Sequence, residues 1–303
     1  FSTQGLKIYT TLDLSLQRRA DAAVLNTVKD LELKFKILRP LRLEGLLISA
    51  ENSTGFVKSL VGGRSYTETT FNRALNMQRQ VGSTFKPFMY LTAFVKGQDQ
   101  QGEHYTPAYM IDDEPWVYET KQGNKKQTWA PKNYEKGYRG RITLREAFEN
   151  SINIPAAKIG LDVGPKNIVD TATKLGIKTK LPEIPSLSLG SVEIKPIELL
   201  QAYSTIANRG LKVELSTVRA VIDQNGGIIA RFIPRTSQEF EPAVFDLLGQ
   251  LLQGVVKNGT AKSMASLGYR DPASGKTGTT SFSRDAWFAG FSNNLTSVSW
   301  VGF

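Results

Sequence analysis

Residues 79–94, RQVGSTFKPFMYLTAF, place a hydroxyl and a cation three positions apart inside an apolar run. If the run is helical, Ser83 and Lys86 share one face, so the amine can reach the hydroxyl. The apolar residues from Phe85 onward occur all round the helix, which is typical of a helix buried on every side. We therefore predict a buried helix over residues 83–95, with a lysine in its first turn.

Gly82 and Pro87 indicate where this helix begins. Glycine permits a sharp turn into the helix, and proline, which has no amide hydrogen, fits only the first turn. We therefore expect the helix to start near Ser83. The hydroxyl would then lie at the positive end of the helix, where unpaired N–H groups can hold a developing oxyanion.

The composition limits which group can activate this serine, because a hydroxyl is a weak nucleophile until a base accepts its proton. The chain has no cysteine and one histidine, His104, in a polar run expected to be an exposed loop. Disulfides and thiolate sites are excluded, and no histidine triad, metal site or cofactor is indicated. Lys86 is then the candidate base. Its pKa, about 10.4 in peptides, must fall by roughly 3 units, or about 4 kcal/mol, through burial and a second nearby cation.

A second short motif, S-x-N, occurs at Ser151 and Asn153 within ENSINIPAA, where two predicted helices meet. Taken alone, it is better explained by a serine that caps a helix with Pro155 in its first turn. The same pattern recurs in a predicted turn at 292–294, so its specificity is low.

A third motif, SGKTGTT, contains Lys276, Thr277, Gly278 and Thr279. Glycine weakens a strand unless something approaches the backbone closely. A cation and two hydroxyls along one strand edge suit the carboxylate of an extended peptide that adds to the sheet. An exposed polar strand end is the alternative interpretation.

Strand patterns lie near both ends of the chain and helical patterns lie between them. This order favours an α+β fold: an antiparallel sheet built from the two chain ends, a helical insertion, and a cleft where they meet. The predicted strands are 5–12, 44–50, 56–61, 285–291 and 297–303, with a hairpin over 218–232 around Asn225 and Gly226. The further predicted helices are 143–150, 154–161, 165–175, 195–208, 241–259 and one that follows an Asp13 cap.

The net charge of +10 comes from 38 Lys and Arg against 28 Asp and Glu, and the basic residues are dispersed. A solvated basic surface explains this balance, and no nucleic-acid-binding motif is present. No apolar run reaches 18 residues, so no membrane span is predicted. Nucleic acid is therefore not an expected partner.

The motifs S-x-x-K, S-x-N and K-T-G follow one another in the order found in penicillin-binding proteins and serine β-lactamases. Longer blocks strengthen the likeness, among them WAPKNYEKGYRGRITLREAFENSINIPA, SLSLGSVEIKPIELLQAYSTIANRG and SGKTGTTSFSRDAWFAGF. Along nearly its whole length the chain resembles the transpeptidase domain of class A, bifunctional penicillin-binding proteins.

This resemblance implies a penicillin-binding-protein/serine β-lactamase-like fold with an all-helical subdomain inserted into the sheet part. Residues 1–42 would be a linker strand and first helix, and 43–303 the transpeptidase domain. Within it, 43–97 and 262–303 would form the sheet part and 98–261 the mainly helical insertion. The family's glycosyltransferase domain, membrane anchor and C-terminal helix are expected outside this chain. The location implied is the bacterial envelope, on the outer (periplasmic) side of the cytoplasmic membrane.

The resemblance also implies roles for the motif residues. Ser83 would attack the penultimate D-Ala carbonyl of a stem peptide ending in D-Ala–D-Ala, and Lys86 would take its proton. Ser151 and Asn153 would relay protons and hold the acyl chain. Lys276 would keep Lys86 neutral and assist protonation of the leaving group.

Substrate binding would fall to the K-T-G-T strand: Thr277 and Thr279 would bind the terminal carboxylate beside Gly278. Backbone N–H groups of Ser83 and Thr279 would form the oxyanion hole. β-Lactam antibiotics would acylate Ser83 and stay bound, and cell-wall synthesis proteins are the expected protein partners.

Three alternatives remain open. A D,D-carboxypeptidase would pass the same acyl group to water. A serine β-lactamase typically carries E-x-x-L-N after S-x-N; SVEIKPIELLQAY offers Glu193 and Glu198 but not that motif. In a β-lactam-sensing receptor domain, the antibiotic would acylate the serine, and no peptide would be cut or joined. The stretch YTTLDLSLQRRADAAV argues against this alternative, because it resembles the linker from a glycosyltransferase domain.

Overall fold

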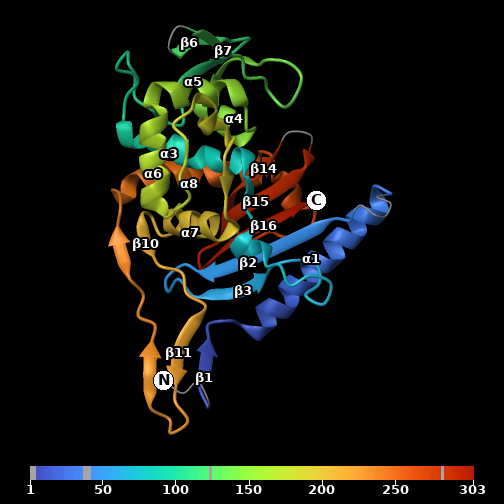
Figure 1. Ribbon diagram of the computed structural model, residues 1–303. Coiled ribbons are helices and arrows are strands. Elements are labelled where there is room, and N and C mark those ends of the chain that lie inside the picture. The colour runs from blue at the N-terminus through green and yellow to red at the C-terminus, as the bar shows by residue number, and fades with distance from the viewer. Residues whose placement is uncertain (1–4, 37–41, 123–124, 281–282) are drawn as a thin grey trace.

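The computed structural model describes residues 5–36, 42–122, 125–280 and 283–303. Its centre is a five-stranded antiparallel sheet in the order β14-β15-β16-β2-β3. Strands β2 and β16 come from opposite ends of the chain and lie side by side (Figure 1). The prediction of a sheet built from both chain ends is confirmed. The strands are β2 (Glu44–Glu51), β3 (Val57–Val61), β14 (Ser274–Thr279), β15 (Asp285–Phe291) and β16 (Leu295–Gly302).

Helix α3 (Lys86–Lys96) runs through the middle of the molecule, and its residues from Lys86 to Phe94 are all buried. It packs against three helices of the insertion, and α7 covers the sheet by contacting β15, β16 and β2. One continuous core spans both parts. The helices around α3 are α4 (Leu144–Glu149), α5 (Asn153–Val163), α6 (Pro165–Leu175), α7 (Pro196–Ala207) and α8 (Pro242–Lys257).

The start of this helix differs from the prediction. Gly82–Phe85 forms a 3₁₀ turn, η1, and the α-helix begins only at Lys86. An α-helical turn starting at Ser83 would need Pro87 to donate to the Ser83 carbonyl, and proline has no N–H. The Lys86 N–H donates to Ser83 O instead, which closes the tighter i→i+3 turn.

The insertion is not all helical, contrary to the resemblance-based expectation. Residues 98–140, which show no clear period, fold into short antiparallel pairs that need few residues and little alternation. Two of their residues, 123–124, lie outside the described part, as do residues 281–282 of the SGKTGTTSFSRDAWFAGF block. The small pairs are β5 (Met110–Asp113) with β8 (Gly140–Thr143), β6 (Tyr118–Gln122) with β7 (Lys125–Trp129), β10 (Leu211–Val213) with β13 (Thr236–Gln238), and β4 (Arg79–Gln80) with β9 (Glu193–Ile194).

The N-terminal segment contacts both the insertion, through residues 7–10, and the main sheet, through its helix. The Asp13 carboxylate accepts from the N–H groups of Ser15 and Leu16, and this caps α1 (Leu14–Lys34) as predicted. Helix α1 lies along β2 and β3 and buries Ala20, Val24 and Val28 (Figure 1). Residues 37–41, which precede the predicted domain boundary at 42, lie outside the described part, and the boundaries themselves stay a prediction.

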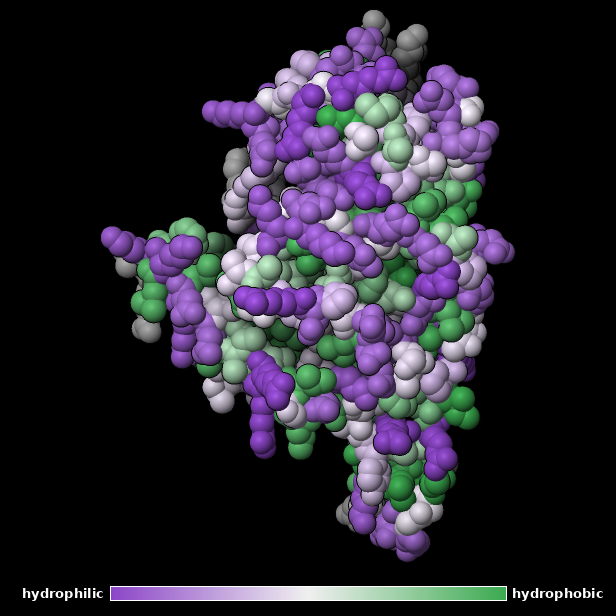
Figure 2. All heavy atoms as spheres, turned by 180° about the vertical axis from the view of Figure 1, so that it is seen from behind, coloured by the Kyte–Doolittle hydropathy of each residue, from purple (hydrophilic) through white to green (hydrophobic). Residues whose placement is uncertain are grey.

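A separate three-stranded sheet, β1-β11-β12, projects from the main body (Figure 1). It consists of β1 (Lys7–Thr10), β11 (Val218–Ile222) and β12 (Ile228–Arg231), and the predicted hairpin at Asn225–Gly226 joins the last two. Apolar side chains are exposed on this lobe, as Figure 2 shows. Short elements complete the fold: α2 (Arg73–Asn76), η2 (Pro185–Leu189) and η3 (Lys262–Met264). In the described residues, no helix combines the length and apolar character needed to span a membrane.

Candidate active site

Two glycines shape the turn that carries Ser83. Gly82 has φ +53° and donates its N–H to the Gly190 carbonyl at 3.1 Å. A Cβ on Gly82 would lie 2.8 Å from Thr279 O, and one on Gly190 would overlap Gly82 O. The turn therefore presses against both β14 and the loop after η2. Ser83 is half-buried, and within the described part of the chain its hydroxyl makes no hydrogen bond.

Lys86 joins the first motif to the second. Its fully buried amine donates to Ser151 O at 2.6 Å, to Ile152 O at 3.1 Å and to Asn153 Oδ1 at 2.8 Å. It also lies 3.4 Å from Ser151 Oγ. Residues 151–153 thus surround the amine with oxygen acceptors, and the predicted S-x-x-K and S-x-N residues meet in one cluster.

Ser151 is held in an unusual conformation between α4 and α5. Its φ is +58°, in the left-handed region that costs a non-glycine residue about 1–2 kcal/mol. Helix α5 starts at Asn153, and its N-cap residue, Ile152, makes no side-chain capping bond. The interpretation of Ser151 as a simple helix cap is therefore wrong. Its left-handed backbone aims both its carbonyl and its hydroxyl at the buried lysines.

Lys276, on β14, completes the cluster. Its fully buried amine donates to Ser151 Oγ at 2.9 Å and to Thr277 O at 3.2 Å. It also lies 6.0 Å from the centre of the Phe148 ring. The Ser151 hydroxyl is therefore placed between two buried amines, an arrangement through which protons can pass without a histidine.

Burial sets the protonation of both lysines. It lowers the pKa of Lys276 to about 7. It also lowers the pKa of Lys86 well below its ordinary value, with the positive charge of Lys276 as a second cause. The three oxygen acceptors around Lys86 favour its charged form, but burial and the neighbouring cation outweigh them. Both causes are those that the sequence predicted.

We expect the lowered pKa of Lys276 to make stability depend on pH. Between about pH 7 and 10 the unfolded chain holds a proton at this position that the folded protein has lost. The free energy of unfolding should therefore rise with pH, by at most about 1.4 kcal/mol per unit for this one group. Urea denaturation at pH 7, 8, 9 and 10 should show a steeper rise for the wild type than for Lys276→Met. Equal slopes would contradict the assignment.

The other residues of the K-T-G-T strand differ in exposure: Thr277 is half-buried, Gly278 is buried and Thr279 is exposed. The Thr277 hydroxyl shares a hydrogen bond of 2.6 Å with that of Thr260, and Thr279 is exposed. A Cβ on Gly278 would lie 2.6 Å from Val81 O, so the close backbone approach that the sequence predicted is present. Thr260 was not anticipated, since it belongs to no motif and reaches the strand only through the end of α8.

The sequence also did not indicate Lys132 and Asn133. The Asn153 amide donates to Lys132 O at 2.8 Å, and Asn133 Oδ1 accepts from the N–H groups of Asn153 and Ile154. Both residues belong to the block WAPKNYEKGYRG, so only the family likeness pointed to this segment.

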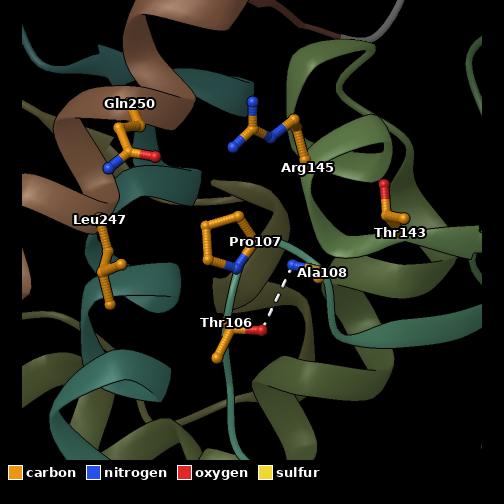
Figure 3. A pocket seen from close by; sticks show the side chains of 7 residues that line it. All are labelled: Thr106, Pro107, Ala108, Thr143, Arg145, Leu247 and Gln250. Atoms are coloured by element: carbon orange, nitrogen blue, oxygen red, sulfur yellow. Dashed lines mark hydrogen bonds between the residues drawn. The ribbon is translucent and has the colours of Figure 1, made fainter.

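A surface hollow of about 430 Å³ lies elsewhere, between the 106–108 loop, α4 and α8 (Figure 3). None of the predicted site residues lines it; its walls are formed by Thr106, Pro107, Ala108, Thr143, Arg145, Leu247 and Gln250. His104 is exposed, as predicted, and its Nε2 lies 2.9 Å from Gln98 Nε2. Among the described residues, no three His, Asp or Glu side chains are grouped so as to hold a metal ion.

Comparison with solved structures establishes the fold. The crystal structure of penicillin-binding protein 1A from Haemophilus influenzae superimposes with a TM-score of 0.87 at 21% identity, covering 98% of this chain and 62% of that one. PonA1 from Mycobacterium tuberculosis, in complex with penicillin V, gives 0.79 at 24% identity, covering 99% and 77%. The expected penicillin-binding-protein fold is confirmed.

Comparison of sequences establishes the family. Penicillin-binding protein 1B of Haemophilus influenzae is 37% identical over 304 residues, covering 99% of this chain and 37% of that protein. Penicillin-binding protein 1A of Neisseria flavescens is 37% identical over 275 residues, covering 89% and 33%. The chain thus spans about a third of the length of these relatives. The profile of the penicillin binding protein transpeptidase domain matches residues 45–301. The chain therefore belongs to the family of penicillin-binding-protein transpeptidase domains.

Proposed function

We propose that the protein is a D,D-transpeptidase, a serine acyltransferase that crosslinks peptidoglycan stem peptides through an acyl-enzyme on Ser83. One observation carries the proposal: the Ser151 hydroxyl lies between two buried amines of lowered pKa, beside the turn that holds Ser83. Such a cluster moves protons near neutral pH without histidine. Family membership supports the same reaction.

Acylation begins when Ser83 Oγ attacks the carbonyl carbon of the penultimate D-Ala. A neutral Lys86 amine has two N–H groups and one lone pair. It can keep two of its three oxygen acceptors while the lone pair takes the Ser83 proton. Catalytic hydrogen bonds are often incomplete without substrate, so the free Ser83 hydroxyl is compatible with this role. The backbone N–H groups of Ser83 and Thr279 would stabilise the oxyanion, and Gly82 packs on the Thr279 backbone as this requires.

The second half of acylation breaks the C–N bond to the terminal D-Ala. The departing amine takes a proton from Ser151 Oγ. The Lys86 ammonium, 3.4 Å from Ser151 Oγ, then passes to Ser151 the proton that it took from Ser83, and Lys276, 2.9 Å from the same hydroxyl, assists this transfer. The hydroxyls of Thr277 and the exposed Thr279 would hold the terminal carboxylate beside Gly278, and Asn153 would steady the acyl chain. An amine of a second stem peptide then attacks the carbonyl carbon of the acyl-enzyme, and its proton is taken up by Ser151 and Lys86. Lys86 returns a proton to Ser83 Oγ as the ester bond breaks, which forms the crosslink and restores the Ser83 hydroxyl.

A β-lactam follows the first half of this path, but its opened ring keeps the leaving group attached. The acyl-enzyme then persists, so β-lactam antibiotics are proposed inhibitors. The proposed setting is the outer face of the bacterial cytoplasmic membrane, with peptidoglycan stem peptides as substrates and other cell-wall synthesis proteins as partners. The relatives are bacterial penicillin-binding proteins 1A and 1B, which supports this setting.

The test uses a fluorescent penicillin and a thioester donor that mimics the acylated stem peptide. We expect a stable adduct on the peptide that contains Ser83, by mass spectrometry, and transfer of the donor's acyl group to an added D-amino acid. Rapid release of the label would favour a β-lactamase, and hydrolysis without transfer would favour a carboxypeptidase. Labelling without turnover of the thioester would favour a sensor domain, and absence of any adduct would refute acyl transfer altogether.

A further inference from the structure

The start of helix α5 is capped from a distant loop. The side-chain oxygen of Asn133 accepts from the N–H of Asn153 at 3.0 Å and from the N–H of Ile154 at 3.3 Å. These are two of the first N–H groups of α5, which normally receive a side-chain acceptor from the helix's own N-cap residue. Here that residue is Ile152, which offers none. The loop between β7 and β8 therefore supplies the missing cap, twenty residues before the helix.

The same loop orients the Asn153 side chain. Asn153 Nδ2 donates to the Lys132 carbonyl at 2.8 Å, and this leaves Oδ1 to accept from Lys86 Nζ, also at 2.8 Å. A carbonyl can only accept, so the contact with Lys132 determines which end of the amide faces the buried amine. Lys132 and Asn133 together hold both the backbone and the side chain of Asn153.

Asp113 holds Asn133 in turn. Its carboxylate is fully buried; Oδ1 accepts from Asn133 Nδ2 at 2.8 Å and Oδ2 from the N–H of Arg139 at 2.9 Å. Because a carboxylate accepts only, it forces the Asn133 amide to direct its oxygen at α5. A second donation, from Asn133 Nδ2 to Gly137 O at 3.3 Å, completes the amide's contacts.

We propose that Asn133, oriented by Asp113, is a positioning residue of the acyl-transfer site. It holds Asn153, and through Asn153 it holds the Lys86 amine at the place from which the Ser83 proton is taken. This inference rests on the proposed function. The chain of contacts from Asp113 through Asn133 and Asn153 to Lys86 is unbroken, and each link has a defined donor and acceptor. Small displacements of a catalytic group slow a reaction by up to about 100-fold.

In the hydrogen bond between Asn133 and Asp113, the amide donates and the carboxylate accepts, so exchanging the two side chains provides a test. Asn133→Asp alone sets two carboxylates against each other, which should displace the loop. In the double variant Asp113→Asn/Asn133→Asp, the new amide accepts from the Arg139 N–H and donates to the new carboxylate. That carboxylate still accepts from the first N–H groups of α5, so the contact with Asn153 is restored, and only the hydrogen bond between residues 113 and 133 is reversed in direction.

The measurement is the limiting rate constant of acylation by a fluorescent penicillin at pH 8, obtained at saturating concentrations, with the melting temperature measured in parallel. We expect Asn133→Asp to lower this rate constant by on the order of 10- to 100-fold and the double variant to recover most of it. The control is Asn72→Ala, which removes the cap of α2, a helix that carries no site residue. It should lower the melting temperature without changing the limiting rate constant.

The outcomes separate the inference from the function on which it rests. A wild type that is never acylated refutes the proposed function and the inference with it. A wild type that is acylated, with Asn133→Asp acylated equally fast, refutes the inference alone. Failure of the double variant to recover any rate, while its melting temperature returns to the wild-type value, would show that the pair stabilises the fold without positioning Lys86.

Discussion

Ser83→Ala is expected to abolish covalent labelling by penicillin and transfer from a thioester donor. The methyl group offers no oxygen to form the acyl bond, so the loss should reach at least about 10⁴-fold, the scale seen when a nucleophile is removed. The fold should be unaffected, because the Ser83 hydroxyl makes no hydrogen bond in the described part of the chain. Gel fluorescence after incubation with the labelled penicillin measures the first effect, and thermal unfolding the second.

The matched control for this variant is Ser237→Ala, which removes an exposed serine hydroxyl of β13. It should be labelled at the wild-type rate. Persistent labelling of Ser83→Ala would identify another nucleophile and overturn the assignment of Ser83.

Lys86→Met should slow acylation by roughly 10²- to 10⁴-fold, the range attributed to a positioned base, while the fold survives. The variant keeps an unbranched side chain in the core but leaves no group to take the Ser83 proton. Its effect on stability is the sum of two opposing changes. Burying a methionine removes the cost of burying an amine, whereas three oxygens of residues 151–153 lose their donor, at about 1–3 kcal/mol each when water does not replace it.

The same substitution at the other end of the same helix provides the control. Lys96 is partly exposed and pairs with Asp162 at 2.6 Å. Lys96→Met should therefore leave the acylation rate unchanged, and its loss of one partly exposed ion pair should cost about 1 kcal/mol or less. If Lys86→Met acylated as fast as Lys96→Met, Lys86 would not be the base. The rate constants come from stopped-flow or gel-based labelling, and the stabilities from urea denaturation.

Elements with strong local signals were predictable. Helix α6 has polar and apolar residues at helical spacing and ends at Leu175 with Gly176 as its cap, and the β11–β12 hairpin has Asn225–Gly226 at its turn. The segment 98–140 was not predictable, because strands of four or five residues carry too little periodicity to be distinguished from loop. The helix start at Lys86 was misplaced by a few residues, although Pro87, which causes the shift, was recognised as a first-turn residue.

The residues of the site also fall into two groups, those that the sequence could predict and those that it could not. The motifs follow one another in an informative order, so the sequence predicts the site residues Ser83, Lys86, Ser151, Asn153 and Lys276. Asp113, Asn133 and Thr260 were missed. Each acts through hydrogen bonds to residues distant in the sequence, and nothing in its local sequence distinguishes it from an ordinary polar residue.

The sequence by itself determined which chemistry to propose: one serine with a lysine three residues on, no cysteine, and one histidine in a predicted loop leave lysine as the candidate base. Only the tertiary structure decided which groups meet. Lys86 reaches Ser151 across 65 residues and Lys276 reaches it across 125. These contacts depend on how α3, β14 and the α4–α5 junction pack together. Burial in that packing lowers both lysine pKa values, and burial is a property of the assembled core that no local pattern of residues contains.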